Sequence, residues 1–584
     1  MTTLNNVTSP DSRAGARRWR YKSPELAVDV IGSPGQGKLA WAVAGWARPW
    51  GSGARTLREP LLLACMAGSI AALLCWAAPP GTDFAAHAYQ RTVFLDHGFQ
   101  LWNNFWYAGH YSFVTYSLLY YPLAAVAGIK LLAVITAALG TLSFAIVLER
   151  EWGPRARLAS LTFAGVWGAY TLTAAFPFAL GMSLGLLAIL ALQAGSRGWF
   201  AVLCPLTLAA SPLAFLLLAL VLAGIAVAGR VGGTRLFWPA VTIIGWGCVE
   251  IVVWRVFPTD GHYPFSATEL FHALVYCAAM VIVTWRVDQA RHLRFIFLAL
   301  AAGCLAAYVM SSDIGENMTR YRFVALPMTI LALSLRDWRP RLVCVGILSL
   351  VLSWNLSPLV KSVSKGSDDP AGAATYWQPA ISFLGAHLTP SYRVEVVGTA
   401  RHWEAAYLPR AGIPLTRGWF RQDDFPQNGV LYRPLTPTKY LAWLRSLGVR
   451  YVVLTDAPPD YSARKEAALI RSGRSHLRPV FRKPDLEIFS VPSARRIVSG
   501  SRPARVVSFS PTRFVLKVAG PGSYRLAVRD SPYWKASPGC LSRGRHGMMR
   551  LTVPRSGTVA VRFSVSPERV LDVLTHGSPD SCRG

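Results

Sequence analysis

Long apolar runs recur between residues 60 and 359, and they restrict the fold of this chain more than any other feature. Each run is roughly 17–22 residues long, the length that an α-helix needs to cross a bilayer. Hydrophobic residues make up 52% of the 584 residues, which favours a polytopic α-helical membrane protein over a soluble one. We expect spans near residues 60–78, 129–149, 157–176, 178–195, 235–257, 269–286, 293–311, 322–337 and 341–359.

One further run, 199–229, is about 30 residues long and is interrupted by Ser211-Pro212. Arg197 and Arg230 flank it, and basic residues gather on the cytoplasmic side of membrane segments. Both ends of the run therefore lie on one side, and we expect a hairpin of two short helices. The prediction is about 11 membrane segments within a transmembrane region of residues 58–362, with the amino end cytoplasmic and the carboxyl end outside the cell.

The two ends of the chain are more polar. Residues 1–57 are rich in Gly, Ser, Pro and Arg, and we expect a disordered cytoplasmic tail. Residues 370–495 alternate strand-like and helix-like segments, which is typical of a small α/β module. Residues 500–584 hold short alternating runs that are typical of an antiparallel β-sandwich. Both parts are expected to be extracytoplasmic, where Cys540 and Cys582 could form a disulfide.

The formal net charge is +30, with 60 Lys and Arg against 30 Asp and Glu. In a soluble protein such an excess suggests binding to nucleic acid. In a chain with many spans it is better explained by orientation in the membrane and by contact with anionic lipid, lipid phosphates or an acidic envelope. We therefore expect a multi-pass protein of the bacterial plasma membrane whose partner is the lipid bilayer, with no nucleic acid.

The stretch from Pro80 to His110 carries more ionisable and aromatic residues than a loop between two spans needs. Asp83 and His87 are four residues apart, which places both on one face of a helix. They are the predicted catalytic residues for acid/base chemistry on a lipid-borne substrate, although Asp83 could instead cap the N-terminus of that helix. The whole outer loop 80–128 is expected to contain helices that lie at the membrane interface.

Candidates for substrate binding follow in the same loop. Asp96 and His97 lie at the far end of the predicted helix, where they could instead form a capped turn before Gly98. The aromatic group after them suits either stacking on a sugar or a belt of side chains at the membrane interface. The candidates from this group and its neighbours are Trp102, Asn103, Tyr107 and His110.

A second polar group lies in SSDIGENMTRYRFVALP, between two predicted spans. Arg320 and Arg322 enter an apolar run, which is costly unless each meets an anion or a carboxylate. Because a guanidinium matches phosphate oxygens in bidentate fashion, we expect both to bind a lipid-linked phosphate, and a structural ion pair is the alternative. Glu316 and Asn317 precede them and are predicted to bind substrate.

Three stretches resemble a known group of membrane proteins: GTDFAAHAYQRTVFLDHG, LWNNFWYAGHYSFVTYSLLYYPLAA and IGENMTRYRFVALP. They are similar to segments of bacterial membrane proteins, actinobacterial ones among them, that are called 6-pyruvoyl-tetrahydropterin synthase-related. Those proteins are grouped with the glycosyltransferase-C superfamily of polytopic enzymes, which carry an acidic residue in the first outer loop and a soluble domain outside. SPYWKASPGC resembles their outer β-domain. The resemblance implies a glycosyltransferase-C-like fold.

The resemblance also implies an activity, an inverting transfer of a sugar from a polyprenyl-phosphate-linked donor to a cell-envelope glycan or lipid acceptor. Asp83 would act as general base in this transfer. Such chemistry requires no metal, although Asp83 and Asp96 could share a divalent metal ion. Two other functions stay open: a non-catalytic membrane protein that binds envelope glycan during assembly, and a transporter of lipid or glycan.

Overall fold

The structure is a computed structural model that describes residues 55–229, 234–364, 369–577 and 582. All of them belong to one compact unit, Gly45–Gly584. The tail expected over residues 1–57 falls almost entirely outside the described residues.

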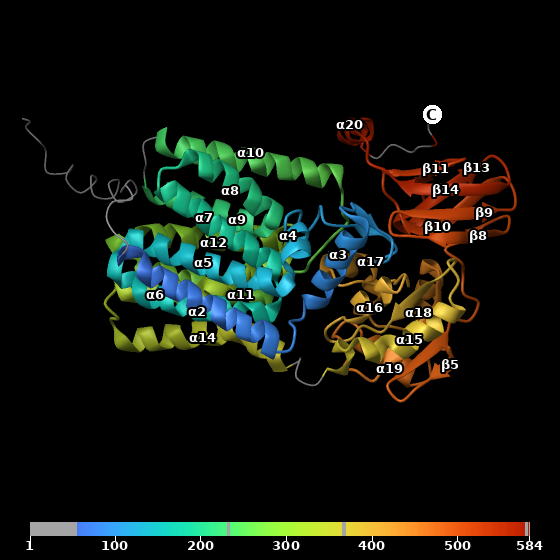
Figure 1. Ribbon diagram of the computed structural model, residues 1–584, viewed down its shortest axis with the longest axis horizontal. Coiled ribbons are helices and arrows are strands. Elements are labelled where there is room, and N and C mark those ends of the chain that lie inside the picture. The colour runs from blue at the N-terminus through green and yellow to red at the C-terminus, as the bar shows by residue number, and fades with distance from the viewer. Residues whose placement is uncertain (1–54, 230–233, 365–368, 578–581, 583–584) are drawn as a thin grey trace, which may run out of the picture. The chain divides into compact units, whose positions relative to one another are not determined.

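Helices that run side by side form the first half of the described chain, as Figure 1 shows. They correspond one to one to the predicted membrane segments, so the polytopic helical fold is confirmed. Within the described residues, eight stretches are long and apolar enough to cross a membrane, and one of these, Ile129–Thr173, contains two of the helices. The helices are α2 Arg55–Ala77, α5 Ile129–Trp152, α6 Arg157–Ala169, α7 Phe176–Gln193, α8 Arg197–Ala210, α9 Pro212–Gly229, α10 Thr234–Val256, α11 Ala267–Thr284, α12 Arg291–Val309, α13 Ala325–Leu335 and α14 Arg341–Ser364.

The predicted hairpin turns at Ser211, between α8 and α9. Ser211 has extended backbone angles, and its hydroxyl accepts a hydrogen bond from the backbone N–H of Ala214 at 3.3 Å. Pro212 opens α9, a position that suits proline because the first amide of a helix has no acceptor within the helix. The apolar run 199–229 is therefore divided into two helices by Ser211-Pro212, which is visible in the sequence.

The loop between α2 and α5 folds into two helices and two short strands: α3 Phe84–His97, β1 Trp102–Asn103, β2 His110–Tyr111 and α4 Tyr120–Ala127. Gly81 starts this loop and packs closely against the η3 turn Tyr170–Thr173. A Cβ added at Gly81 would lie 2.4 Å from the carbonyl oxygen of Leu172, so only glycine fits there. Tyr120 and Tyr121 of α4 are fully buried, whereas Val126 is 91% exposed. The loop thus packs one face inward and leaves the other open.

A mixed four-stranded sheet follows, in the order β3-β4-β6-β5. The strands β3 and β4 are parallel, and β4 and β5 each pair antiparallel with β6. Gly448 ends α18 in the left-handed conformation at φ 79° and leads directly into β4, as the predicted helix end requires. The elements are α15 Ala374–His387, β3 Arg393–Val396, α16 Glu404–Arg410, α17 Arg421–Gln427, α18 Pro437–Leu447, β4 Val449–Thr455, α19 Arg464–Arg471, β5 Arg478–Arg482 and β6 Leu486–Ser490.

Two antiparallel sheets, β12-β13-β10-β7 and β11-β14-β9-β8, enclose a shared apolar core and form the predicted sandwich. On β9, Phe514, Leu516 and Val518 alternate inward, as a strand with one buried face requires. A disulfide joins Cys540 of β12 to Cys582. The elements are β7 Val498–Gly500, β8 Ala504–Phe509, β9 Arg513–Val518, β10 Gly522–Arg529, β11 Trp534–Ser537, β12 Cys540–Arg543, β13 Met548–Val553, β14 Gly557–Phe563 and α20 Pro567–His576.

Candidate functional site

The carboxylate of Asp83 and the guanidinium of Arg320 lie 3.9 Å apart, Oδ2 to Nη2. Asp83 immediately precedes α3, and its side chain makes no capping hydrogen bond to that helix. Arg320 belongs to the 3-10 helix η5, Gly315–Val324. Both side chains are about one fifth to one quarter exposed, at 20% and 24%. The carboxylate is therefore directed away from the helix end and remains accessible.

Two cavities of about 330 and 370 Å³ meet at this pair. Both are lined by Thr82, Asp83, Tyr263, Asn317 and Arg320. What we call the first cavity extends to the α/β region, where its further lining includes Trp419, Phe420, Arg421, Gln422, Asp460 and Tyr461. The second cavity extends along the helix bundle, where its further lining includes Tyr170, Thr173, Glu316, Arg322, Pro358 and Ser362.

The surroundings of Asp83 favour a protonated carboxyl more than water does. Burial raises the pKa of Asp83 above its usual value, and the charge of Arg320, a hydrogen bond from Trp419 and the charge of Arg421 offset part of that rise. A carboxyl whose pKa is moved toward neutrality is a better proton acceptor at that pH than an ordinary, more acidic one.

Arg322 lines the second cavity beside Arg320. Its Nη1 lies 3.4 Å from Oε2 of Glu269, so the ion pair that the sequence leaves open does exist. Its Nε is buried and has no hydrogen-bond partner among the described residues. Two guanidinium groups, one with an unused donor, therefore face the same cavity.

The two candidates that precede Arg320 also reach the site. Glu316 lines the second cavity, and its Oε2 accepts a hydrogen bond from the hydroxyl of Ser266 at 3.0 Å. Asn317 lines both cavities. The segment between α12 and α13 thus supplies most of the polar wall that the sequence predicts for it.

His87 lies behind the site and lines neither cavity. It is fully buried among Tyr116, Tyr120 and Tyr121, and its Nδ1 lies 3.2 Å from the hydroxyl of Tyr121. Burial, together with the nearby charge of Arg320, lowers the pKa of His87 to about 3. His87 is therefore neutral at physiological pH and supports the loop that carries Asp83.

The structure does not bring the other loop candidates to the cavities. Asp96 and His97 are exposed at the far end of α3. The remaining four are buried, and each makes a packing or polar contact. Trp102 stacks on Phe563, Asn103 bonds the Tyr89 hydroxyl, the Tyr107 hydroxyl donates to the Phe420 carbonyl and His110 lies 3.6 Å from Asp423.

Asn103 bonds within the loop, whereas Trp102, Tyr107 and His110 tie the loop to the C-terminal half of the chain, and their neighbours do the same. The indole N–H of Trp106 donates to the carbonyl of Ala405 at 3.0 Å, and Arg410 donates to the carbonyl of Ala88 at 2.7 Å. These bonds hold the α/β region against α3, directly beside Asp83.

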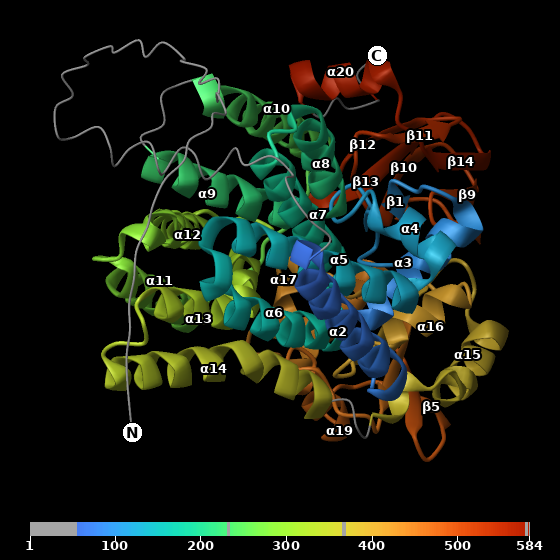
Figure 2. The ribbon, with the colours of Figure 1, turned by 60° about the vertical axis from the view of Figure 1, so that its left-hand side comes forward.

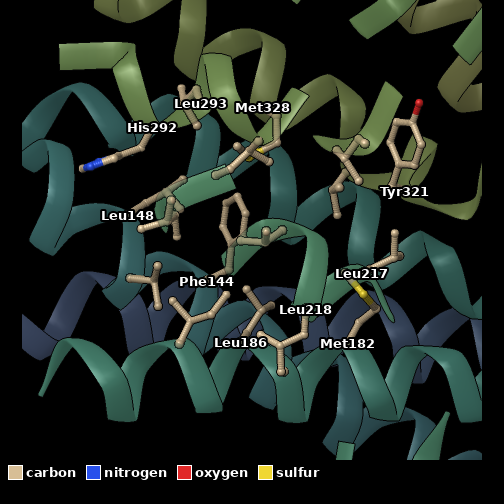
Figure 3. A pocket seen from close by; sticks show the side chains of 18 of the residues that line it. Phe144, Leu148, Met182, Leu186, Leu217, Leu218, His292, Leu293, Tyr321 and Met328 are labelled. Carbon is tan, nitrogen blue, oxygen red and sulfur yellow. The ribbon is translucent and has the colours of Figure 1, made fainter. Parts of the chain in front are cut away.

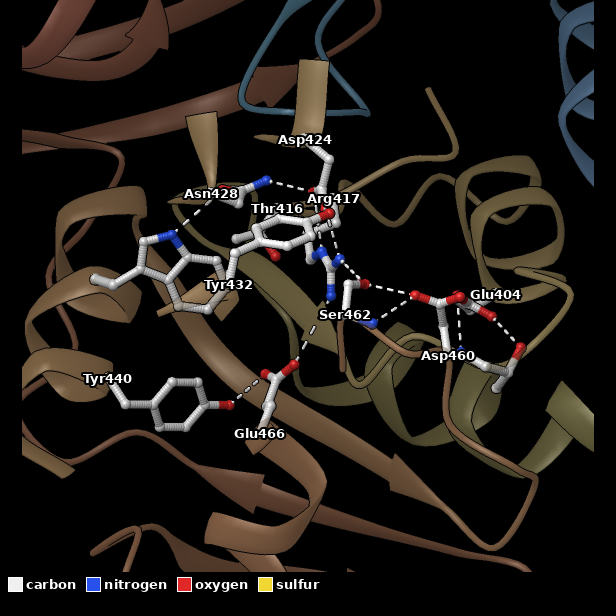
Figure 4. A network of polar contacts seen from close by, with 12 residues as sticks. Glu404, Thr416, Arg417, Asp424, Asn428, Tyr432, Tyr440, Asp460, Ser462 and Glu466 are labelled. Carbon is white, nitrogen blue, oxygen red and sulfur yellow. Dashed lines mark hydrogen bonds and ion pairs between the residues drawn. The ribbon is translucent and has the colours of Figure 1, made fainter. Parts of the chain in front are cut away.

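A polar network inside the α/β region supports the wall of the first cavity (Figure 4). The guanidinium of Arg417 binds both carboxylate oxygens of Asp424, at 3.0 and 2.6 Å, and donates to the hydroxyl of Ser462 at 2.8 Å. Ser462 in turn donates to Asp460 at 2.6 Å, and Asp460 pairs with Arg421 at 2.7 Å. Buried bonds of this kind fix the positions of Arg421 and Asp460, the two network residues that line the first cavity.

The cavity-lining residues of the α/β region were not predicted from the sequence. The signal for them is GWFRQDD, where aromatic, basic and acidic residues adjoin within a few positions. Nothing in that pattern indicates that it faces a loop more than three hundred residues earlier.

A third cavity, of about 170 Å³, lies within the helix bundle (Figure 3). Its lining is mainly apolar, and includes Phe144, Leu148, Met182 and Leu217. Neither Asp83 nor Arg320 contributes to it, and we place no chemistry there.

Within residues 55–229, 234–364 and 369–577, no group of three or more His, Cys, Asp and Glu side chains is arranged to hold a metal ion. Asp83 and Asp96 lie at opposite ends of the 14-residue helix α3, too far apart to share one ion.

Comparison with known proteins finds distant likenesses in structure. No family model and no curated protein matches the chain. The chain is similar to the arabinofuranosyltransferase AftD from mycobacteria, at 18% identity and a TM-score of 0.45, over 76% of this chain and 40% of AftD. The archaeal oligosaccharyltransferase AglB from Archaeoglobus fulgidus follows at 14% identity and a TM-score of 0.41, over 69% of this chain and 70% of AglB.

ArnT from Cupriavidus metallidurans is similar at 15% identity and a TM-score of 0.37, over 74% of this chain and 98% of ArnT. The chain thus spans less than half the length of AftD. The narrower resemblance to the synthase-related membrane proteins stays a prediction, since no family model matches.

Proposed function

We propose that this protein is an inverting membrane glycosyltransferase that moves a sugar from a polyprenyl-phosphate donor to an envelope glycan or lipid acceptor. The observation that carries the proposal is the pair Asp83 and Arg320, 3.9 Å apart where two cavities meet. Transfer needs a proton acceptor for the acceptor hydroxyl and a cation for the leaving phosphate of the donor. The two groups must lie side by side, and each substrate must be able to reach them from its own side.

In the proposed reaction, the Asp83 carboxylate takes the proton of the acceptor hydroxyl as that oxygen attacks the anomeric carbon. The bond from the anomeric carbon to the carrier phosphate breaks on the opposite face, and its electron pair leaves with the phosphate. The configuration at the anomeric carbon is therefore inverted. A phosphate leaves without protonation, so one base is sufficient.

The second cavity suits the donor. Arg320 and Arg322 both line it. The buried Nε of Arg322 has no hydrogen-bond partner among the described residues, so it can donate to a phosphate oxygen. Two guanidinium groups on one phosphate match its charge and its geometry. The adjoining lining from α14, Pro358 and Ser362, belongs to a candidate membrane span, as a lipid-linked substrate requires.

We further propose that the end of the bundle with the α/β region and the sandwich lies outside the cell. The disulfide between Cys540 and Cys582 supports this, because such bonds persist in oxidising compartments. The basic residues Arg155, Arg157 and Arg197 lie at the other end of the helices, where positive charge is expected on the cytoplasmic side.

The test is transfer by purified protein in lipid nanodiscs, with polyprenyl-phosphate-linked sugars as donors and envelope extract as acceptor. We expect Asp83→Asn to insert and fold normally and to lose transfer by a factor of about 100 or more. Asp288→Asn, which changes an exposed carboxylate at the start of the short helix before α12, is the matched control and should keep full activity. Undiminished transfer by Asp83→Asn would overturn the base assignment.

A further inference from the structure

The part of the first cavity's wall that comes from the α/β region contains a stack of two aromatic side chains and one cation. The guanidinium of Arg421 lies 4.7 Å from the ring centre of Tyr461 and 5.2 Å from that of Trp419. Trp419 lines the same cavity as Asp83. The stack therefore shares its cavity with the candidate base.

Arg421 is fixed and electrically compensated. It pairs with Asp460 at 2.7 Å, donates to the hydroxyl of Ser462 at 2.9 Å and lies 3.1 Å from Nε2 of His402. A guanidinium with this many partners supports the rings above it and does not attract a separate anion.

Tyr461 is the open end of the stack. The residue is 52% exposed although Arg421 lies against its ring, and it lines the first cavity. An aromatic ring that is held rigidly and left open on one side is a platform for the apolar face of a sugar ring.

The charges of the first cavity argue against an anionic ligand. Its described lining contains Asp83, Asp313 and Asp460, and two arginines, each already beside a carboxylate. Oδ1 of Asp313 is buried and has no hydrogen-bond partner among the described residues, while Oδ2 accepts a bond from Thr259 at 2.8 Å. The cavity thus offers acceptors for hydroxyl groups and no uncompensated cation.

We propose that the first cavity is the acceptor subsite, and that it takes an uncharged sugar residue of a glycan, stacked on Tyr461 with a hydroxyl directed to Asp83. The assignment rests on the proposed function. It adds the chemical class of the acceptor and the residue that recognises it.

The experiment separates Tyr461 from the chemistry. In nanodiscs, Tyr461→Ala should raise the KM for acceptor by roughly threefold to tenfold and leave the KM for donor unchanged, while Tyr461→Phe should behave as wild type. Tyr392→Ala is the matched control, since Arg450 lies 6.0 Å from that ring and Tyr392 lines neither cavity. Equal acceptor KM for Tyr461→Ala and wild type would overturn the subsite.

Binding gives a readout that does not depend on transfer. Asp83→Asn protein should bind neutral pentasaccharides from a panel of hexose and pentose polymers in native mass spectrometry, and should bind penta-galacturonate at least tenfold more weakly. Adding Tyr461→Ala should remove the neutral binding. Tighter binding of the uronate, or neutral binding that does not depend on Tyr461, would contradict this inference. If the proposed function itself were wrong, the wild-type protein would show no transfer.

A second inference rests on α20, which lies beside α10 in both views (Figures 1 and 2). Val573 on one face of α20 packs into the sandwich core, while Leu571 and Leu574 on another face are 62% and 37% exposed. That core continues onto Val256, the last residue of α10, whose carbonyl accepts a hydrogen bond from Tyr533 at 2.7 Å.

The end of a membrane span lies at the bilayer surface, and exposed apolar residues continue along α10 at Ile251 and Trp254. An amphipathic helix placed there meets lipid headgroups on its apolar side. We infer that Leu571 and Leu574 insert into the outer bilayer surface and hold the sandwich against the membrane.

The test is an environment-sensitive fluorophore on Leu571→Cys in nanodiscs, in a chain whose exposed Cys65 and Cys248 are first replaced by serine. We expect blue-shifted emission that spin-labelled lipids quench. Lys517→Cys, exposed on β9 of the sandwich, is the control and should emit as in water. Water-like, unquenched emission from both positions would refute the insertion.

Discussion

Asp83 and Arg320 lie 3.9 Å apart although they come from opposite ends of the transmembrane half of the sequence. Neither side chain serves only the structure of its own segment. Asp83 makes no capping hydrogen bond to α3, and Arg320 lines both cavities. The pair is partly buried, so its charges act over a lower dielectric than at a free surface. The following predictions start from this relationship and from the residues that support it.

Removal of the Asp83 charge should not destabilise the fold. Because the pKa of Asp83 is raised in the folded protein, its ionised form costs folding free energy at pH values above the usual pKa of the carboxyl. Asp83→Asn should therefore unfold at the same or a slightly higher temperature than wild type at pH 7. Thermal unfolding in detergent measures this, and a clear loss of stability would show that Arg320 stabilises the ionised form more than burial disfavours it.

The rate of transfer should rise with pH through an apparent pKa above that of an ordinary aspartate. Only the ionised carboxylate can accept the proton, and burial raises its pKa. Trp419→Phe removes a hydrogen bond that lowers this pKa, so it should move the profile further toward high pH. The measurement is kcat/KM against pH for both proteins. A profile without a shift would exclude Trp419 as a positioning residue for Asp83.

Arg322→Gln should weaken donor binding. A hydrogen bond to a charged group contributes about 1.5–3 kcal/mol, which corresponds to a roughly 10- to 100-fold higher KM for the polyprenyl-phosphate donor. The acceptor KM should stay constant. Arg336→Gln serves as control, since Arg336 donates to the Val283 carbonyl at 3.2 Å and lines neither cavity. Equal donor KM for both variants would remove Arg322 from the donor site.

Asp424→Asn should destabilise the α/β region by about 3–5 kcal/mol, because it removes the carboxylate that binds the buried guanidinium of Arg417 in bidentate fashion. Burial by itself raises the pKa of Asp424, but the charge of Arg417 outweighs it and holds the pKa at about 2. The stabilisation is therefore present above the usual carboxyl pKa and is lost as the pH falls through about 2. Limited proteolysis at neutral pH measures the destabilisation, and wild-type resistance in the variant would contradict it.

The sequence alone determined the architecture, because its signals are local. The lengths of the apolar runs predicted the bundle helices, Ser211-Pro212 predicted the turn between α8 and α9, and period-two alternation predicted strands such as β9. Helix length and side-chain alternation depend on near neighbours along the chain, so they are readable without the fold. The polar segment with Arg320 was likewise visible, since a guanidinium in an apolar run requires a partner.

Only the tertiary structure decided which elements face each other. Trp102 and Tyr107 looked like residues that stack on a sugar, yet both are buried against the C-terminal half of the chain, and Trp419, Arg421 and Tyr461 face the cavity instead. Periodicity shows which side of an element is buried, but it carries no information about the distant segment that covers that side. Long-range packing and the hydrogen bonds of the loop around α3 make that choice.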